Sequence, residues 1–219
     1  VTGVQTCALP ISSLVGNTGN LGIPLGIALF GIESVPYTSI INIGNTLFIY
    51  IFSVYFFARD QFSIKQAIIS IMKIPGIWFA LLALIINYNG ITINKHIYSA
   101  LEMGAYTSMV IQLLIFGIYL YSVKIKSIPW HLSLHISFVK HILLPFIGIF
   151  IVLCFTNLNS FVASILIMEL MVPLAVNNVN LAALYNCKPF DVAATILISS
   201  SLFVMFLYFY IEVINYFIR

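Results

Sequence analysis

The sequence predicts an all-α polytopic membrane protein, and three properties of the chain carry that prediction. Hydrophobic residues make up 62% of its 219 residues and charged residues only 7%, and its mean hydropathy of +1.11 lies far above that of soluble domains. At about 20 apolar residues for each helix that crosses a bilayer, such a chain holds roughly seven helices. The net charge of +3 then reflects loop topology, so no nucleic-acid partner is expected.

The apolar segments are separated by short polar connections. We expect helices at 12–31, 35–58, 74–91, 98–122, 136–156, 161–185 and 191–217. None of the connections is long enough to form a soluble domain. The chain is therefore expected to lie almost entirely within and at the surface of the bilayer.

Positively charged residues gather on one side of this topology. That side collects Arg59, Lys65, Lys73, Lys124, Lys126, Lys140 and Lys188. The other side collects only Lys95 and Arg219. The first side is expected to be cytoplasmic, which places the C-terminus outside, with Lys140 and His141 extending to the cytoplasmic surface.

The first eleven residues, VTGVQTCALPI, are what one reading frame of a common sequencing-library adapter would encode. We expect residues 1–11 to be an artefact and the natural protein to begin further upstream. Cys154 and Cys187 have no CxxC or metal-ligand spacing, so neither a disulfide nor a redox role is expected.

Two apolar segments are interrupted near their centres. In GNTGNLGIPLGIALFG, residues 16–31, the stretch from Asn20 to Pro24 is expected to break a helix near the bilayer midplane. Lipid offers no replacement hydrogen bonds, so such a break must face protein or a water-filled cavity. The amides of Asn17 and Asn20, one turn apart, could bond the freed carbonyls or a ligand.

The second interruption lies in MELMVPLAVNNVNLAALYN, residues 168–186. Pro173 stands near its centre, three asparagines follow, and Glu169 precedes it by one turn. Paired interruptions indicate a secondary transporter with inverted repeats, whose substrate lies where the broken helices meet. Each proline is expected at the start of a second half-helix, whose free N–H groups and positive dipole end would suit an anion.

Both stretches resemble motifs of the auxin efflux carrier family. GNTGNLGIPLGIALFG is similar to the pattern of its fourth helix, and VPLAVNNVNLAALYN to that of its ninth. The resemblance implies an inverted-repeat fold with two crossing discontinuous helices, like that of bile-acid symporters and sodium–proton antiporters, of which this chain holds helices 4 to 10 of ten. Residues 12–58 would end the first repeat, 59–73 form a cytoplasmic connection, and 74–219 form the second repeat.

The same resemblance implies a permease that moves small organic anions, such as malate, across the cell membrane. It implies a substrate contact for Asn17, crossover positions for Pro24 and Pro173, and a motif position for Asn177. The chain departs from the family pattern at Asn20, Leu174, Asn178 and Asn180. These departures leave the identity of the substrate undetermined.

The candidate residues have two roles. Substrate contact is expected from Asn17, Asn20, Gly22, Pro24, Pro173, Asn177, Asn178 and Asn180. Glu169 is a candidate for proton coupling, because intramembrane acids are rarely without function. Asn42 and Asn45 are expected to join helices by hydrogen bonds. Glu102 is expected to be solvated, and His131 and His135 lack a third metal ligand.

Rival classes fit less well. No paired-aspartate, Ser-His or HExxH arrangement supports an enzyme, so no catalytic residue, metal or cofactor is expected. A sodium-coupled bile-acid-type symporter is the nearest alternative, followed by a channel or a seven-helix receptor. The expected partners are an organic anion, the lipid bilayer and a coupling proton or sodium ion, with a homodimer left open.

Overall fold

The computed structural model describes residues 15–49, 72, 75–121, 128–184 and 188–218. The adapter-like residues 1–11 and nearly all of the expected connection at 59–73 lie outside these ranges. Within them the chain is helical and contains no strand. The expected all-α fold is confirmed in this respect.

The helices follow the seven expected segments closely. The first half of the described chain contains η1 (Thr18–Gly22), α2 (Ile23–Phe30), η2 (Ile32–Ser34), α3 (Val35–Phe48), α6 (Pro75–Tyr88) and α7 (Lys95–Tyr121). The second half contains α8 (Trp130–Phe138), η5 (Val139–Leu143), α9 (Leu144–Phe155), α10 (Ser160–Met171), α11 (Asn177–Leu184) and α12 (Pro189–Ile218).

Within the described ranges, two continuous helices are long and apolar enough to cross a bilayer. They run from Trp130 to Phe155, through α8, η5 and α9, and from Pro189 to Phe217 in α12. The first begins six residues before the expected position 136, because Trp130 opens its first turn directly after Pro129. Thr18–Phe30 and Ser160–Met171 are shorter apolar helices of half-membrane length.

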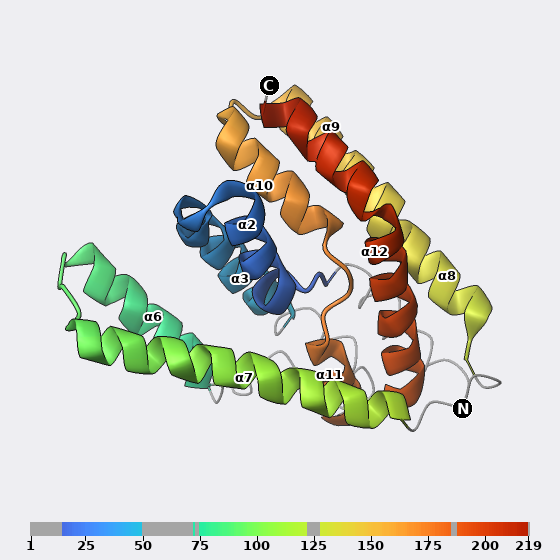
Figure 1. Cartoon of the computed structure of the whole chain (residues 1–219), viewed down its shortest axis with the longest axis horizontal. Helices are drawn as coiled ribbons and strands as arrows, with labels where there is room; N and C mark the ends of the chain where they lie inside the picture. Colours follow the sequence, from blue (N-terminus) through green and yellow to red (C-terminus); the bar gives the residue numbers. More distant parts are fainter. Residues whose placement is uncertain (1–14, 50–71, 73–74, 122–127, 185–187, 219) are drawn as a thin grey trace.

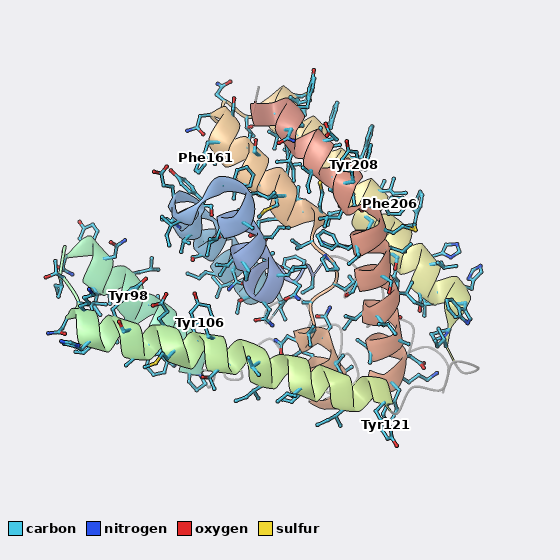
Figure 2. The ribbon with its side chains drawn as sticks, viewed as in Figure 1. Tyr98, Tyr106, Tyr121, Phe161, Phe206 and Tyr208 are labelled. Atoms are coloured by element: carbon cyan, nitrogen blue, oxygen red, sulfur yellow. The ribbon has the colours of Figure 1, made fainter. Side chains whose placement is uncertain are left out.

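Large apolar side chains cover the outside of these helices. Phe146, Phe150 and Phe155 on α9 and Val204 and Met205 on α12 are all exposed. Figure 2 shows Tyr208 on α12 and Tyr98, Tyr106 and Tyr121 along α7 at the surface. So much exposed apolar surface suits contact with lipid rather than with water.

Two of the helices contain a π-turn that is followed by a proline. In η1, Pro24 comes two residues after the last π-helical residue, Gly22, and in η5 Pro145 comes two residues after Leu143. Proline lacks an N–H and crowds the carbonyl four residues before it, so the preceding turn widens. In η5 that carbonyl belongs to His141, and the Tyr210 hydroxyl donates to it at 3.5 Å.

The short helices α2 and α10 lie at the centre of the molecule. Figure 1 shows α2 and α3 beside α10, with α12 and the α8–α9 helix on one side and the long α7 on another. One apolar cluster, which includes Val15, Leu174 and Val179, packs around the start of η1 and α11, and another joins α10 to α12. The break between α10 and α11 therefore lies between two packed regions.

Candidate functional site: the helix crossing

The residues just before η1 cross the link between α10 and α11, and both stretches are non-helical where they cross. The main-chain N–H of Asn17 donates to the carbonyl of Pro173 at 2.8 Å, and that of Ala175 donates to Val15 at 3.0 Å. This pairs Gly16 with Leu174 as an isolated antiparallel bridge. In Figure 1 the start of the described chain runs beside the link from α10 to α11. Each break thus satisfies main-chain groups of the other, as an apolar interior requires.

Side chains from neighbouring helices satisfy further main-chain groups at the crossing. Asn45 of α3 donates to the Gly16 carbonyl at 2.9 Å. Leu174 donates its N–H to the Ser199 hydroxyl of α12 at 3.2 Å, and His141 Nε2 lies 2.9 Å from that hydroxyl. The crossing is therefore fixed to α3, α12 and η5.

The breaks lie at other residues than we expected. In the first segment the described non-helical residues are Val15 to Asn17, while Pro24 is already in the first turn of α2. In the second segment α10 ends at Met171, and Pro173 lies in the extended link rather than at the start of α11. The expectation that each proline opens a half-helix is wrong for Pro173, because pairing with Asn17 keeps it extended.

A polar cavity of about 240 Å³, here called the amide pocket, opens beside the crossing. Its lining comprises Gly16, Asn17, Thr18, Gly19, Asn20, Asn42, Asn45, Thr46, Ile49, Ala175 and Asn177. Both interrupted segments and α3 contribute to it. Five asparagine side chains thus converge on one cavity and provide both donors and acceptors.

Hydrogen bonds hold several of these amides. The Thr18 hydroxyl donates to Asn42 Oδ1 at 2.9 Å and accepts from Asn45 at 3.0 Å. Asn180 donates to Asn177 Oδ1 at 3.4 Å. The expectation that Asn42 and Asn45 join helices is confirmed, and the structure adds that both line the pocket.

The structure brings together some of the expected substrate contacts and separates others. Asn17, Asn20 and Asn177 line the amide pocket. The others lie outside its lining: Gly22 and Pro173 are buried, Pro24 is exposed, Asn178 is 2% exposed in α11, and Asn180 is half-buried beside Asn177.

A second cavity, of about 410 Å³, lies on the other side of the Gly16–Thr18 chain and is here called the charged cavity. It is lined by Gly16, Thr18, Ile41, Gly44, Asn45, Phe48, Lys140, Leu144, Leu166, Glu169 and Leu170. Gly16, Thr18 and Asn45 line both cavities and form the wall between them.

Lys140 and His141 do not reach the surface, contrary to our expectation. Lys140 is 1% exposed and His141 5%, and both lie in η5 near the middle of the Trp130–Phe155 helix. The π-turn before Pro145 places Lys140 in the lining of the charged cavity and His141 against Ser199. Pro145 was the sequence signal for this widened turn.

Two glycines make room for the buried charges. A Cβ atom on Gly16 would lie 2.8 Å from the Lys140 ammonium nitrogen, and one on Gly22 would collide with the Glu169 carboxylate. Gly22 therefore leaves space for the Glu169 carboxylate. Both glycines belong to the first interrupted segment, whereas Lys140 and Glu169 come from η5 and α10.

The remaining candidates lie apart from the crossing. Glu102 is exposed on α7. The rings of His131 and His135 lie 4.2 Å apart between centres, at an angle of 34°, and both residues are exposed in α8. Across the described ranges, no group of three or more His, Cys, Asp or Glu side chains could hold a metal ion.

A family model described as membrane transport protein matches residues 61–211, more than half of the chain. The chain belongs to the membrane transport protein family. The family is one of transporters, not of enzymes, and the apolar helices agree with a location in the membrane. Neither a curated protein nor a solved structure matches the chain.

The matched range of this membrane transport protein includes one arm of the crossing. It covers Lys140, Glu169, Asn177 and Ser199, whereas Asn17 lies before it. The match therefore confirms the part of the resemblance that assigns the chain to a family of membrane transporters.

Proposed function

We propose that this membrane transport protein is a secondary transporter that moves small organic anions, such as carboxylates, across the cell membrane by alternating access. The crossing of two interrupted helices beside the amide pocket supports this proposal most directly. Transporters with discontinuous helices hold their substrate where such breaks meet. The proposed substrate contacts are Asn17, Asn20 and Asn177. Asn178 and Asn180 belong to the same helix as Asn177, α11, and are proposed to hold Asn177 in position.

The chemistry of the pocket favours an anion. The apolar helix Thr18–Phe30 and the helix Asn177–Leu184 both begin at this pocket. The N-terminus of a helix carries free N–H groups and about half a positive charge, which together stabilise an anion. Asparagine amides add further donors, so a carboxylate is bound without an ion pair to the pocket lining.

The crossing also suggests how access alternates. We propose that the panel carrying the crossing helices moves relative to the other helices, so that the amide pocket opens to one side at a time. The inverted repeat, the malate-permease-like subtype, the outward C-terminus and a homodimer belong to the same proposal. The outward C-terminus is inferred from the excess of lysine and arginine on the expected cytoplasmic side. That side still has the excess when the buried Lys140 is left out of the count.

Uptake of radiolabelled malate into proteoliposomes tests this function. We expect saturable uptake that exchanges with unlabelled malate, which separates a carrier from a channel. Asn17→Ala should abolish uptake, whereas Asn89→Ala, at an exposed amide that bonds Ile85, should leave it unchanged. Equal uptake by wild type and Asn17→Ala would refute the assignment, and uptake that requires sodium would favour a sodium-coupled symporter.

A further inference from the structure

Two opposite charges line the charged cavity without forming an ion pair. Among the described residues only Lys188 and Asp191 form one, at 4.0 Å. Glu169 is 2% exposed, and neither of its carboxylate oxygens has a hydrogen-bond partner. Lys140 is 1% exposed and is the charge that acts on Glu169. A buried carboxylate without donors depends on a nearby cation or a proton for its stability.

Lys140 also lies close to the amide pocket. Its ammonium nitrogen is held against Gly16, in the wall shared by the two cavities. No cationic side chain lines the amide pocket itself. An anion in that pocket would be separated from the Lys140 ammonium by a single extended chain, and the field of a charge is strong in such an apolar interior.

We propose that Lys140 is shared between Glu169 and the bound anion, so that each anion entering the amide pocket is accompanied by one proton that Glu169 takes up. In the empty protein the Glu169 carboxylate balances the Lys140 ammonium. When an anion binds, it balances Lys140 instead, and Glu169 accepts a proton from water to become a carboxylic acid. The proton leaves when the anion leaves. This inference rests on the proposed function and adds its coupling mechanism.

Among the described titratable groups, only Lys140 and Glu169 line the charged cavity. In η5, His141 lines neither cavity: its Nε2 bonds Ser199 and its buried Nδ1 has no hydrogen-bond partner. In α12 the Tyr210 hydroxyl donates to the His141 carbonyl. The segments η1 and α2 contain no titratable side chain, α3 contains only Tyr37, and α9 contains only Cys154, which is exposed. Glu212 of α12 is also exposed. Glu169 is thus the group best placed to take up the proton.

Proton uptake on binding tests the inference directly. Malate binding to the purified protein is measured by calorimetry in buffers of different ionisation enthalpy, which gives the number of protons bound per malate. We expect about one proton per malate, and an affinity that rises as the pH falls, by up to about tenfold per pH unit. Malate binding without proton uptake would overturn the inference and leave the proposed function standing. Absence of malate binding would contradict both.

Variants assign the two roles. Glu169→Gln should bind malate without proton uptake, whereas Glu102→Gln, on an exposed acid, should behave as wild type. Lys140→Gln should weaken malate binding by about fivefold or more but leave binding of the neutral malamide unchanged. Lys188→Gln removes an exposed lysine and serves as its control. Equal loss of malate and malamide binding in Lys140→Gln, or proton uptake retained in Glu169→Gln, would contradict the assignment.

Discussion

The N–H of Asn17 donates to the carbonyl of Pro173 at 2.8 Å, although 155 residues of sequence lie between them. This bond joins the non-helical residues before η1 to the link between α10 and α11. It also brings Asn17 and Asn177 into the lining of one cavity, the amide pocket. The pairing that stabilises the breaks thus also assembles the proposed binding site.

Gly22→Ala tests whether the space at Gly22 belongs to Glu169. The added methyl group would collide with the carboxylate, and such overpacking costs about 1–3 kcal/mol. We expect a lower unfolding midpoint in detergent. The double variant Gly22→Ala/Glu169→Ala should unfold near the midpoint of Glu169→Ala alone, because the carboxylate that the methyl group would meet is then absent.

Gly117→Ala is the matched control for this substitution, since nothing lies within 4 Å of a Cβ atom at Gly117. We expect it to unfold at or slightly above the wild-type midpoint, because alanine favours helix. Equal midpoints for Gly22→Ala and wild type would show that the carboxylate does not occupy this space.

Ser199→Ala tests the connection between the crossing and α12. It removes the hydroxyl that accepts the Leu174 N–H and contacts His141, which leaves a buried donor without a partner. Such a loss costs about 1–3 kcal/mol. We expect thermal unfolding to show this loss for Ser199→Ala but not for Ser201→Ala, whose exposed hydroxyl bonds only its own helix.

Asn45→Ala tests the wall between the two cavities. Asn45 donates to the Gly16 carbonyl and to the Thr18 hydroxyl, so its loss frees the Gly16 carbonyl from α3 and leaves the Thr18 hydroxyl bonded to Asn42 alone. We expect a decrease in stability of about 1–3 kcal/mol and weaker malate binding. Asn87→Ala, at an exposed amide on α6, is the control. Unchanged malate affinity in Asn45→Ala would show that the wall does not shape the site.

Much of the fold follows from the sequence. Hydropathy predicted the helical segments, and the disturbance around Pro173 predicted the break between α10 and α11. For the first segment the structure describes only the helix that follows the break. Local preferences could not show which residues become extended, since that depends on the pairing of Gly16 with Leu174 across the fold. The prolines mark the disturbed segments, but tertiary hydrogen bonds determine where each helix stops.

The candidate site was predicted only in part. Asn17, Asn20 and Asn177 line one pocket, and their roles as substrate contacts stay a prediction. Lys140 was assigned to the surface because a lysine near the end of an apolar segment usually extends outward. The earlier start of the helix at Trp130 and the π-turn before Pro145 place it near the middle instead.

A double-mutant cycle on malate affinity tests the central claim that both arms of the crossing form one anion site. Affinity is measured for wild type, Asn17→Ala, Asn177→Ala and the double variant. We predict that each single substitution weakens binding and that the two effects are coupled by about 0.5 kcal/mol or more, as for residues that share a ligand. Unchanged affinity in either single variant, or effects that simply add, would contradict the claim.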